Sequence, residues 1–373
     1  MLFINQTYAP DVAASAQLLE DMARQFADAG HEVAVITSRS LYGQAGTTLP
    51  KYEKRDGVEV HRVGISRFGK GSLRARTFDA AVFYLAATWK AWRVKLPGGS
   101  PQVVVTLTSP PFIGFIGALA RTLRGGRRRG RYYVNWEMDL YPDVLTAAGL
   151  VTARSLTGRL LHWLNRCSLR LADRVVMVGR CMQDRVTRQG VPAERTEMIS
   201  VWPVSPVLDP AEAARPSSYR EAWGLDGKFV VMYSGNLGIA HDAQTLRAAA
   251  KLLRHRDDIR FVFVGGGKRR HEITDFVAEH GLNNVIVKGY EPREKLADLL
   301  RLGDVHLISQ REEFTGVVVP SKLFGIMASS RPSLYVGPAD AEVARVLTES
   351  GSGEVLPLGA ATLLAREIER LAA

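Results

Sequence analysis

Residues 233–242 read YSGNLGIAHD, and residues 317–328 read VVVPSKLFGIMA. The first stretch continues the apolar run FVVMY, which predicts a buried parallel strand, and its glycines predict a tight turn before a helix. Such a turn lets backbone N–H groups approach an anion. In the second stretch Ser321 and Lys322 follow a proline, which is typical of the first turn of a helix. Two such helix starts together predict a diphosphate site, and a plain turn with a plain helix cap is the alternative.

The rest of the chain alternates strand and helix, which is typical of parallel α/β sheets. Strands are expected at 1–5, 31–38, 57–63, 103–107, 132–136, 173–178, 198–201, 229–233, 261–264, 285–288, 305–309 and, as the final strand, 333–336. Helices are expected at 16–29, 78–93, 112–123, 155–171, 180–188, 242–254, 271–280, 293–300 and 362–371. Four prolines between residues 203 and 216 predict a linker, so we expect two domains, residues 1–205 and 206–373.

The net charge of +11 belongs to the first half of the chain. Residues 1–205 hold 28 Lys and Arg against 16 Asp and Glu, whereas residues 206–373 hold 21 against 22. Basic residues alternate with apolar and aromatic ones at 89–96, 123–133 and 159–174. This pattern favours contact with anionic lipid or with a pyrophosphate-linked acceptor, and solvated helix faces are the alternative. No recognised nucleic-acid-binding module accompanies the charge, so no nucleic acid partner is expected.

The composition also predicts where in the cell the protein is found. No window reaches about 18 uninterrupted apolar residues, so no membrane-spanning helix is expected. The opening MLFINQTYAP is unlike a secretion signal. Cys167 and Cys181 match no metal-ligand spacing and suggest no disulfide framework. We therefore expect a cytoplasmic protein without a structural metal.

Carboxylates follow one of the expected strands of the first half, in WEMDLYPDVLTAAG at residues 136–149. Ligands of open α/β sheets bind at the carboxyl ends of the strands. Glu137 and Asp139 share one side if the strand continues, because side chains two residues apart point the same way. Aspartate is also a good helix cap, so capping the next helix is the alternative role.

YSGNLGIAHD and VVVPSKLFGIMA together resemble the donor domain of the retaining glycosyltransferases of family four, and the likeness covers nearly the whole chain. The chain is most similar to the bacterial branch that builds capsule, O-antigen or colanic-acid-type polysaccharides. The resemblance implies a GT-B fold, in which two Rossmann-like parallel-sheet domains face each other across a cleft. It implies a first domain that binds a glycan or polyprenyl-pyrophosphate-linked acceptor and a second that binds a nucleotide sugar, with UDP favoured over GDP.

The resemblance also implies roles for particular residues. The segment from Asp139 to Asp143, DLYPD, is similar to the branch's acceptor-side motif, so Asp139 is expected to act as a base with Glu137 beside it. Acceptor-side contacts are further expected from Ser15, Asp143 and Arg180. The expected donor-binding residues are Gly235, Asn236, Leu237, Gly238, Gly265, Lys268, Tyr290, Pro292, Glu313, Ser321 and Lys322. Lys322 would supply fixed, catalytic positive charge to the diphosphate, so neither metal nor cofactor is expected, and the protein would work at the inner face of the plasma membrane.

The chain departs from the family pattern at several positions. Alanines and Ser15 stand where the family has a glycine-rich loop, Asn236 replaces an arginine, and Gly325 replaces the second of two glutamates. The ribose role then falls to Glu312 or Glu313. The family's last helix returns to the first domain, and here the chain ends soon after residue 371. A nucleotide-sugar epimerase of the same fold, a non-catalytic sugar-nucleotide-binding subunit and a basic membrane scaffold remain alternatives.

Overall fold

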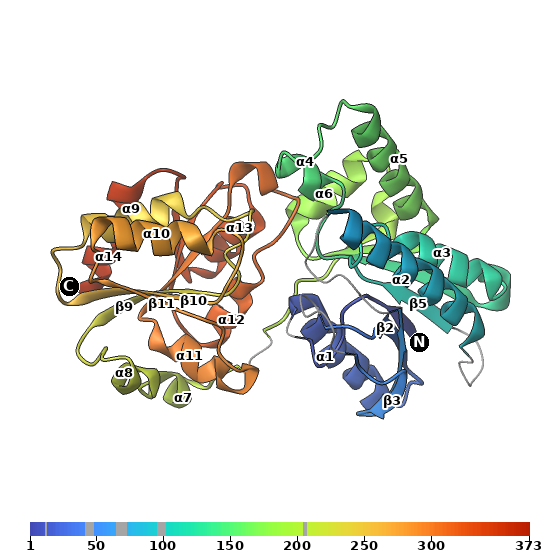
Figure 1. Ribbon diagram of the computed structural model, residues 1–373, viewed down its shortest axis with the longest axis horizontal. Helices are drawn as coiled ribbons and strands as arrows, with labels where there is room; N and C mark the ends of the chain where they lie inside the picture. The colour runs from blue at the N-terminus through green and yellow to red at the C-terminus, as the bar shows by residue number, and fades with distance from the viewer. Residues whose placement is uncertain (12, 42–47, 65–72, 95–101, 204–206) are drawn as a thin grey trace. The chain divides into compact units, whose positions relative to one another are not determined.

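The structure, a computed structural model, describes residues 1–11, 13–41, 48–64, 73–94, 102–203 and 207–373 (Figure 1). The chain divides into two units, Met1–Ser200 and Val201–Ala373. The domain boundary expected at residue 205 falls in 204–206, outside the described residues. In the described part of the chain, no helix has both the length and the apolar character needed to cross a bilayer.

The first unit contains an eight-stranded sheet in the order β3-β4-β2-β1-β5-β6-β7-β8. All neighbours are parallel except β3, which pairs antiparallel with β4 at the edge. The strands are β1 Leu2–Ile4, β2 Ala34–Ser38, β3 Tyr52–Arg55, β4 Val58–Val63, β5 Gln102–Thr106, β6 Arg131–Glu137, β7 Arg174–Met177 and β8 Thr196–Met198. Their order reverses between β1 and β5, which makes the carboxyl ends of these strands a position where ligands commonly bind.

Helices cover both faces of this sheet, as is usual for parallel sheets. They are α1 Ala14–Asp28, α2 Leu73–Arg93, α3 Gly114–Leu123, α4 Asp143–Ala147, α5 Leu156–Leu171 and α6 Arg180–Arg188, with short 3-10 turns at Arg127–Arg129 and Ala193–Arg195. Buried residues of α2 and α3, such as Phe83, Ala87 and Ile116, pack on Leu2 and Ile4 of the central strand.

The second unit contains a six-stranded, fully parallel sheet in the order β11-β10-β9-β12-β13-β14. Its strands are β9 Phe229–Ser234, β10 Ile259–Val264, β11 Val285–Lys288, β12 Val305–Ser309, β13 Ser333–Val336 and β14 Gly353–Leu356. Its helices are α7 Pro210–Ala214, α8 Tyr219–Ala222, α9 Gln244–Leu252, α10 Arg270–His280, α11 Leu296–Leu302, α12 Lys322–Ala328, α13 Glu342–Ser350 and α14 Ala361–Ala372, with 3-10 turns at Arg293–Lys295 and Glu312–Phe314. Here the strand order reverses between β9 and β12.

The expected fold class, two Rossmann-like parallel sheets, is confirmed, and the differences concern single elements. Strand β3 was not expected because its sequence YEKR is polar and mostly exposed. The prediction of 333–336 as the final strand is wrong, since β14 pairs beside it. The proline-rich segment is not wholly irregular, because Asp209 begins α7 with a reciprocal capping box that includes Glu212.

Candidate functional site

A glycine loop follows β9, at the point where the second sheet reverses its strand order. Gly235 has a φ of +116°, a conformation that side chains disfavour, and its N–H donates to the Val264 carbonyl at 2.9 Å. Leu237 is buried and its N–H donates to the Gly266 carbonyl at 2.7 Å. These bonds hold the predicted donor loop against the loop that follows β10.

The loop after β10 needs its glycines as well. A Cβ on Gly265 would lie 2.3 Å from the Gly235 carbonyl oxygen, and one on Gly267 would lie 2.3 Å from the Leu237 carbonyl oxygen. Both glycines also have φ values beyond +110°. Only glycine therefore lets the two loops meet backbone to backbone.

Lys322 lies directly beside the first of these loops. Its Nζ is 3.4 Å from the centroid of the Tyr233 ring, and a Cβ placed on Gly235 would be 3.9 Å from it. Although the residue is partly exposed, the ammonium itself is buried and has no hydrogen-bond partner in the described part of the chain. Burial lowers the pKa of Lys322 well below its usual value. The ring face offers the cation some stabilisation but no hydrogen bond.

The segment that leads to Lys322 is fixed by a buried glutamine. Gln310 Nε2 donates to the carbonyls of Phe314 at 2.9 Å and Val318 at 3.2 Å, and Tyr335 donates its hydroxyl to Gln310 Oε1 at 3.2 Å. The Arg311 N–H also donates to the Ala240 carbonyl at 2.8 Å. These bonds set the path of the chain from the end of β12 to the start of α12. Since α12 has only seven residues, the lysine side chain rather than the helix dipole carries the positive charge here.

Sequence reasoning missed two further residues near the lysine. His241 donates Nδ1–H to the Ser309 carbonyl at 2.6 Å, and burial together with Lys322 lowers its pKa to about 3, so its imidazole is neutral. Arg269 donates to the His241 carbonyl and forms an ion pair with Glu272 at 2.5 Å. His241 lies in the quoted stretch 233–242, and Arg269 follows the predicted donor residue Lys268. Nothing local to the sequence shows that His241 approaches the end of β12 or that Arg269 bonds to His241.

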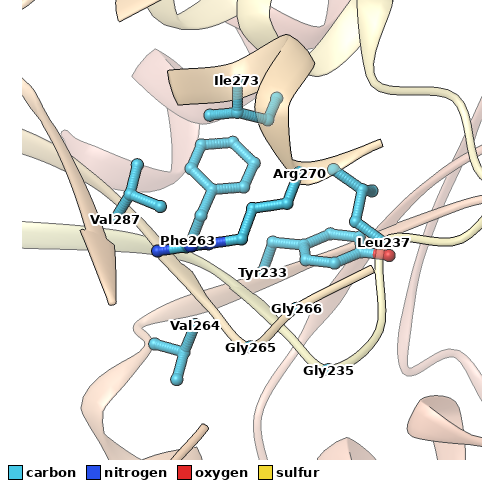
Figure 2. Close-up of a pocket in the computed structure, with 10 residues that line it drawn as sticks. All are labelled: Tyr233, Gly235, Leu237, Phe263, Val264, Gly265, Gly266, Arg270, Ile273 and Val287. Atoms are coloured by element: carbon cyan, nitrogen blue, oxygen red, sulfur yellow. The ribbon is translucent and has the colours of Figure 1, made fainter. Parts of the chain in front are cut away.

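A pocket opens between the two glycine loops, and Figure 2 shows its lining. Tyr233, Phe263, Ile273 and Val287 give it apolar walls. The Arg270 side chain runs across it, with a buried Nε that has no hydrogen-bond partner in the described residues (Figure 2). The pocket therefore combines flat apolar surface with one cation.

The other predicted donor residues surround these loops in different ways. Asn236 and Lys268 are exposed, and Gly238 accepts from the His241 N–H at 3.1 Å. Tyr290 is 64% exposed, and its ring lies where a Cβ on Gly266 would be 2.8 Å from Cε2. The remaining three are Pro292 before the 3-10 turn at Arg293–Lys295, Ser321, an exposed residue that makes no capping bond, and Glu313, which pairs with Arg311 at 2.9 Å. Their contacts with a ligand stay predictions.

In the first unit, Glu137 ends β6 inside a polar pocket. Asn135 Nδ2 donates to Glu137 Oε1 at 2.8 Å, and the pocket also exposes Thr108, Asn165 and Ser168. Burial raises the pKa of Glu137 to about 8, and the neighbouring carboxylates of the acidic segment add to the rise. Glu137 is thus mostly protonated at neutral pH and can donate a hydrogen bond.

Asp139 lies two residues further on. Thr108 Oγ1 accepts from the N–H groups of Met138 at 2.7 Å and Asp139 at 3.4 Å, which fixes the backbone here. Although Asp139 is partly exposed, desolvation raises its pKa to about 6. A carboxylate with that pKa is ionised at neutral pH and remains a competent base.

The other predicted acceptor-side residues lie in different surroundings. Asp143 is buried in the first turn of α4, where Arg185 pairs with Oδ1 at 2.6 Å and His162 Nδ1 lies 3.9 Å from Oδ2. It therefore ties three helices together. Ser15 Oγ lies 3.1 Å from Thr7 Oγ1, and Arg180 is the first residue of α6. In the described residues, no three His, Cys, Asp or Glu side chains are grouped as metal ligands.

Comparison with known proteins finds relatives that cover most of the chain. The chain is 25% identical to the WcaI protein of Escherichia coli, named for colanic acid biosynthesis, over 354 residues covering 91% of this chain and 83% of that one. It is 29% identical to the glycosyltransferase WbjE of Pseudomonas aeruginosa over 305 residues, 80% and 71% of the two chains. The crystal structure of Anabaena HepE in complex with UDP-glucose has the same fold, with a TM-score of 0.66, 18% identity and coverage of 99% and 88%.

The family models divide the chain much as its structure does. The "Glycosyl transferase 4-like domain" matches residues 14–202, about half of the chain. The "Glycosyl transferases group 1" domain matches residues 217–327, which include the glycine loops and Lys322. The chain therefore belongs to the glycosyltransferases that join a 4-like domain to a group 1 domain.

Proposed function

We propose that the protein transfers a sugar from a UDP-linked donor to a glycan or lipid-linked acceptor during synthesis of a cell-surface polysaccharide. One observation carries the proposal: the buried Nζ of Lys322 lies beside a glycine loop without a hydrogen-bonding partner in the described residues. Its charged form is costly there unless an anion joins it. The names of WcaI and the HepE complex with UDP-glucose support the choice of pathway and donor.

The donor diphosphate would bind between Lys322 and the backbone of residues 235–238, with Ser321 at its edge. Negative charge develops on the leaving diphosphate, and a fixed cation with oriented N–H groups stabilises that charge without a metal. The nucleobase would enter the pocket of Figure 2, which Gly265 and Gly266 line. Tyr290, whose ring lies beside Gly266, and Pro292 would contact it from outside that lining. Lys268 would contact a phosphate and Glu313 the ribose.

The acceptor would meet Asp139, which takes the proton of the attacking hydroxyl. Glu137, neutral at pH 7, would hold an acceptor oxygen by donating a hydrogen bond. We propose retention of the anomeric configuration, a hexosyl or N-acetylhexosaminyl group, a polyprenyl-pyrophosphate-linked acceptor and action at the inner face of the plasma membrane. These finer assignments rest on the family resemblance and the position of the carboxylates.

The test replaces Lys322 by methionine, which keeps most of the length of the side chain and cannot carry its charge. We expect kcat/KM for the nucleotide sugar to fall by about 10²-fold or more. The melting temperature should stay the same or rise, because the variant no longer buries an unpaired amine. Turnover of UDP-sugars and differential scanning fluorimetry measure the two effects.

Lys251→Met on helix α9 is the matched control, since it removes a lysine from the same unit away from the glycine loops. Normal turnover in the Lys322→Met protein would remove the donor site assigned here. A fall in melting temperature together with turnover would instead make Lys322 a structural residue.

A further inference from the structure

Helix α5 presents a row of apolar side chains to solvent. Leu156, Leu160 and Trp163 are each more than half exposed. Spaced four and three residues apart, they share one side of the helix. The opposite side buries Gly158, Asn165, Ser168 and Leu169 against the protein. Single exposed leucines are common on protein surfaces, but an aligned row that contains tryptophan indicates a binding surface.

Helix α2 repeats the arrangement. Leu85, Trp89 and Trp92 have the same spacing and are also more than half exposed, while Phe83 and Ala91 of the same helix are buried in the core. The guanidinium of Arg93 lies 4.5 Å from the centroid of the Trp89 ring. An aromatic with a cation on its face suits the boundary between water and an apolar phase.

Helix α3 connects the two rows. It packs against both α2 and α5, and Leu119 and Leu123 on its exposed side are four residues apart. Figure 1 shows α2 and α3 lying next to each other in the first unit. The outer sides of α2, α3 and α5 therefore form one layer, called here the arginine–tryptophan face.

Charge on this face has one sign. From residue 80 of α2, and throughout α3 and α5, the sequence holds no Asp or Glu and six Lys and Arg, of which Arg121 pairs with Asp173. Arg154, Arg159 and Arg166 are exposed and form no ion pair in the described residues. A partner must accept both apolar side chains and a concentrated positive charge.

We propose that the arginine–tryptophan face docks on the surface of an anionic lipid membrane. Headgroups would pair with the arginines while the leucines and tryptophans enter the boundary with the acyl chains. A second copy of this chain fits poorly, because its identical face would bring arginine against arginine. Nucleic acid would satisfy the charge but leave the leucines in water. The inference does not rest on the donor site.

Vesicle co-sedimentation of the full chain tests the proposal. We expect binding to phosphatidylcholine vesicles that contain about one third phosphatidylglycerol, and about tenfold weaker binding to pure phosphatidylcholine. The triple variant Arg154→Glu/Arg159→Glu/Arg166→Glu should lower the partition into anionic vesicles at least tenfold. A second variant, Trp89→Ala/Trp163→Ala, should lower it while leaving the charge unchanged.

The matched control is Arg215→Glu/Arg254→Glu/Arg366→Glu, three exposed arginines of the second unit, which should bind vesicles nearly as well as the parent protein. Circular dichroism melting checks that each variant folds. If the control variant lost as much vesicle binding, net charge alone would explain the effect, and the assignment of this face would be overturned. Lack of vesicle binding, or a dimer in light scattering that the tryptophan variant dissociates, would overturn it as well.

Discussion

The carboxyl ends of the two sheets both hold buried ionisable groups. They differ in whether the chain supplies hydrogen-bond partners for these groups. In the first unit the chain supplies partners: Asn135 for Glu137 and Arg185 for Asp143. In the second unit the Lys322 ammonium lies over the face of the Tyr233 ring and has no hydrogen-bond partner among the described residues. A group that the chain already bonds, such as Glu137, is held in position before any ligand binds, whereas one left without a hydrogen bond marks a place where a ligand completes the structure. Asp139 stands between these cases, since it is buried enough to shift its pKa and has no cation beside it in the described residues.

The largest effect is expected at Asp139. Asp139→Asn should lower kcat by about 10²–10⁴-fold, because the amide cannot take the proton of the acceptor. Donor affinity, which we propose to reside in the second unit, should hardly change. Steady-state kinetics with calorimetric titration of the nucleotide sugar separate the two. An unchanged kcat would remove Asp139 from the proposed acceptor site. Asp143→Asn, which deprives Arg185 of its ion pair, should lower the melting temperature and serves as a comparison for an acid with a structural contact.

Glu137 should show the next largest effect, on stability. Its folded pKa of about 8 lies above the ordinary 4.5, so the folded state binds the extra proton and stability falls as pH rises through this window. From pH 5 to pH 8 its contribution to the free energy of unfolding should fall by about 3 to 4 kcal/mol. Glu137→Gln cannot ionise and should remove that part of the slope.

Urea unfolding at pH 5, 6.5 and 8 measures the difference between the parent protein and Glu137→Gln. At pH 5 the two should be close, and at pH 8 the variant should be the more stable. Parallel slopes would show that Glu137 is ionised throughout and that the two units differ less than proposed.

The smallest effect is a proton taken up when the donor binds. Lys322 has a lowered pKa in the free protein, and a diphosphate beside it would raise that pKa again. Donor affinity should therefore be constant at low pH and weaken, by at most about tenfold per pH unit, as pH rises between the two values. Calorimetry in buffers of different ionisation enthalpy counts the protons.

Lys322→Met should bind donor weakly and with no proton uptake attributable to this site. If the variant still took up a proton on binding the donor, another group would accept that proton. Lys322 would then already be charged in the free protein, and the contrast drawn between the two sheet ends would fail.

Much of the fold follows from local pattern. Apolar runs such as 229–233 and 305–309 correctly predict buried parallel strands, and the glycines after β9 correctly predict a tight turn. Strand β14, GEVL, was missed because four residues that begin with glycine carry little periodic signal. It is a strand because it pairs with β13, a contact between segments about twenty residues apart.

The candidate site, too, could be predicted only where the signal is local to the sequence. Lys322 could be selected from its place after Pro320, but its position over Tyr233 depends on how β9 and α12 meet in the folded sheet. His241 and Gln310 were missed for that reason, since each acts through bonds to residues far along the chain or around a loop. Asp143 was grouped with the acceptor acids because the sequence does not reveal Arg185 as its partner.

The contact between the loops at Gly235 and Gly265 limits how this protein can diversify. A methyl group on Gly265 would lie 2.3 Å from the Gly235 carbonyl oxygen, and Gly235 itself has space for one but a φ of +116° that disfavours any side chain. Both glycines therefore restrict change in these loops. A new preference for sugar or base would then arise around their rim, where Asn236, Lys268 and Tyr290 have exposed side chains. Libraries aimed at altered donors should randomise those three positions and leave the glycines untouched.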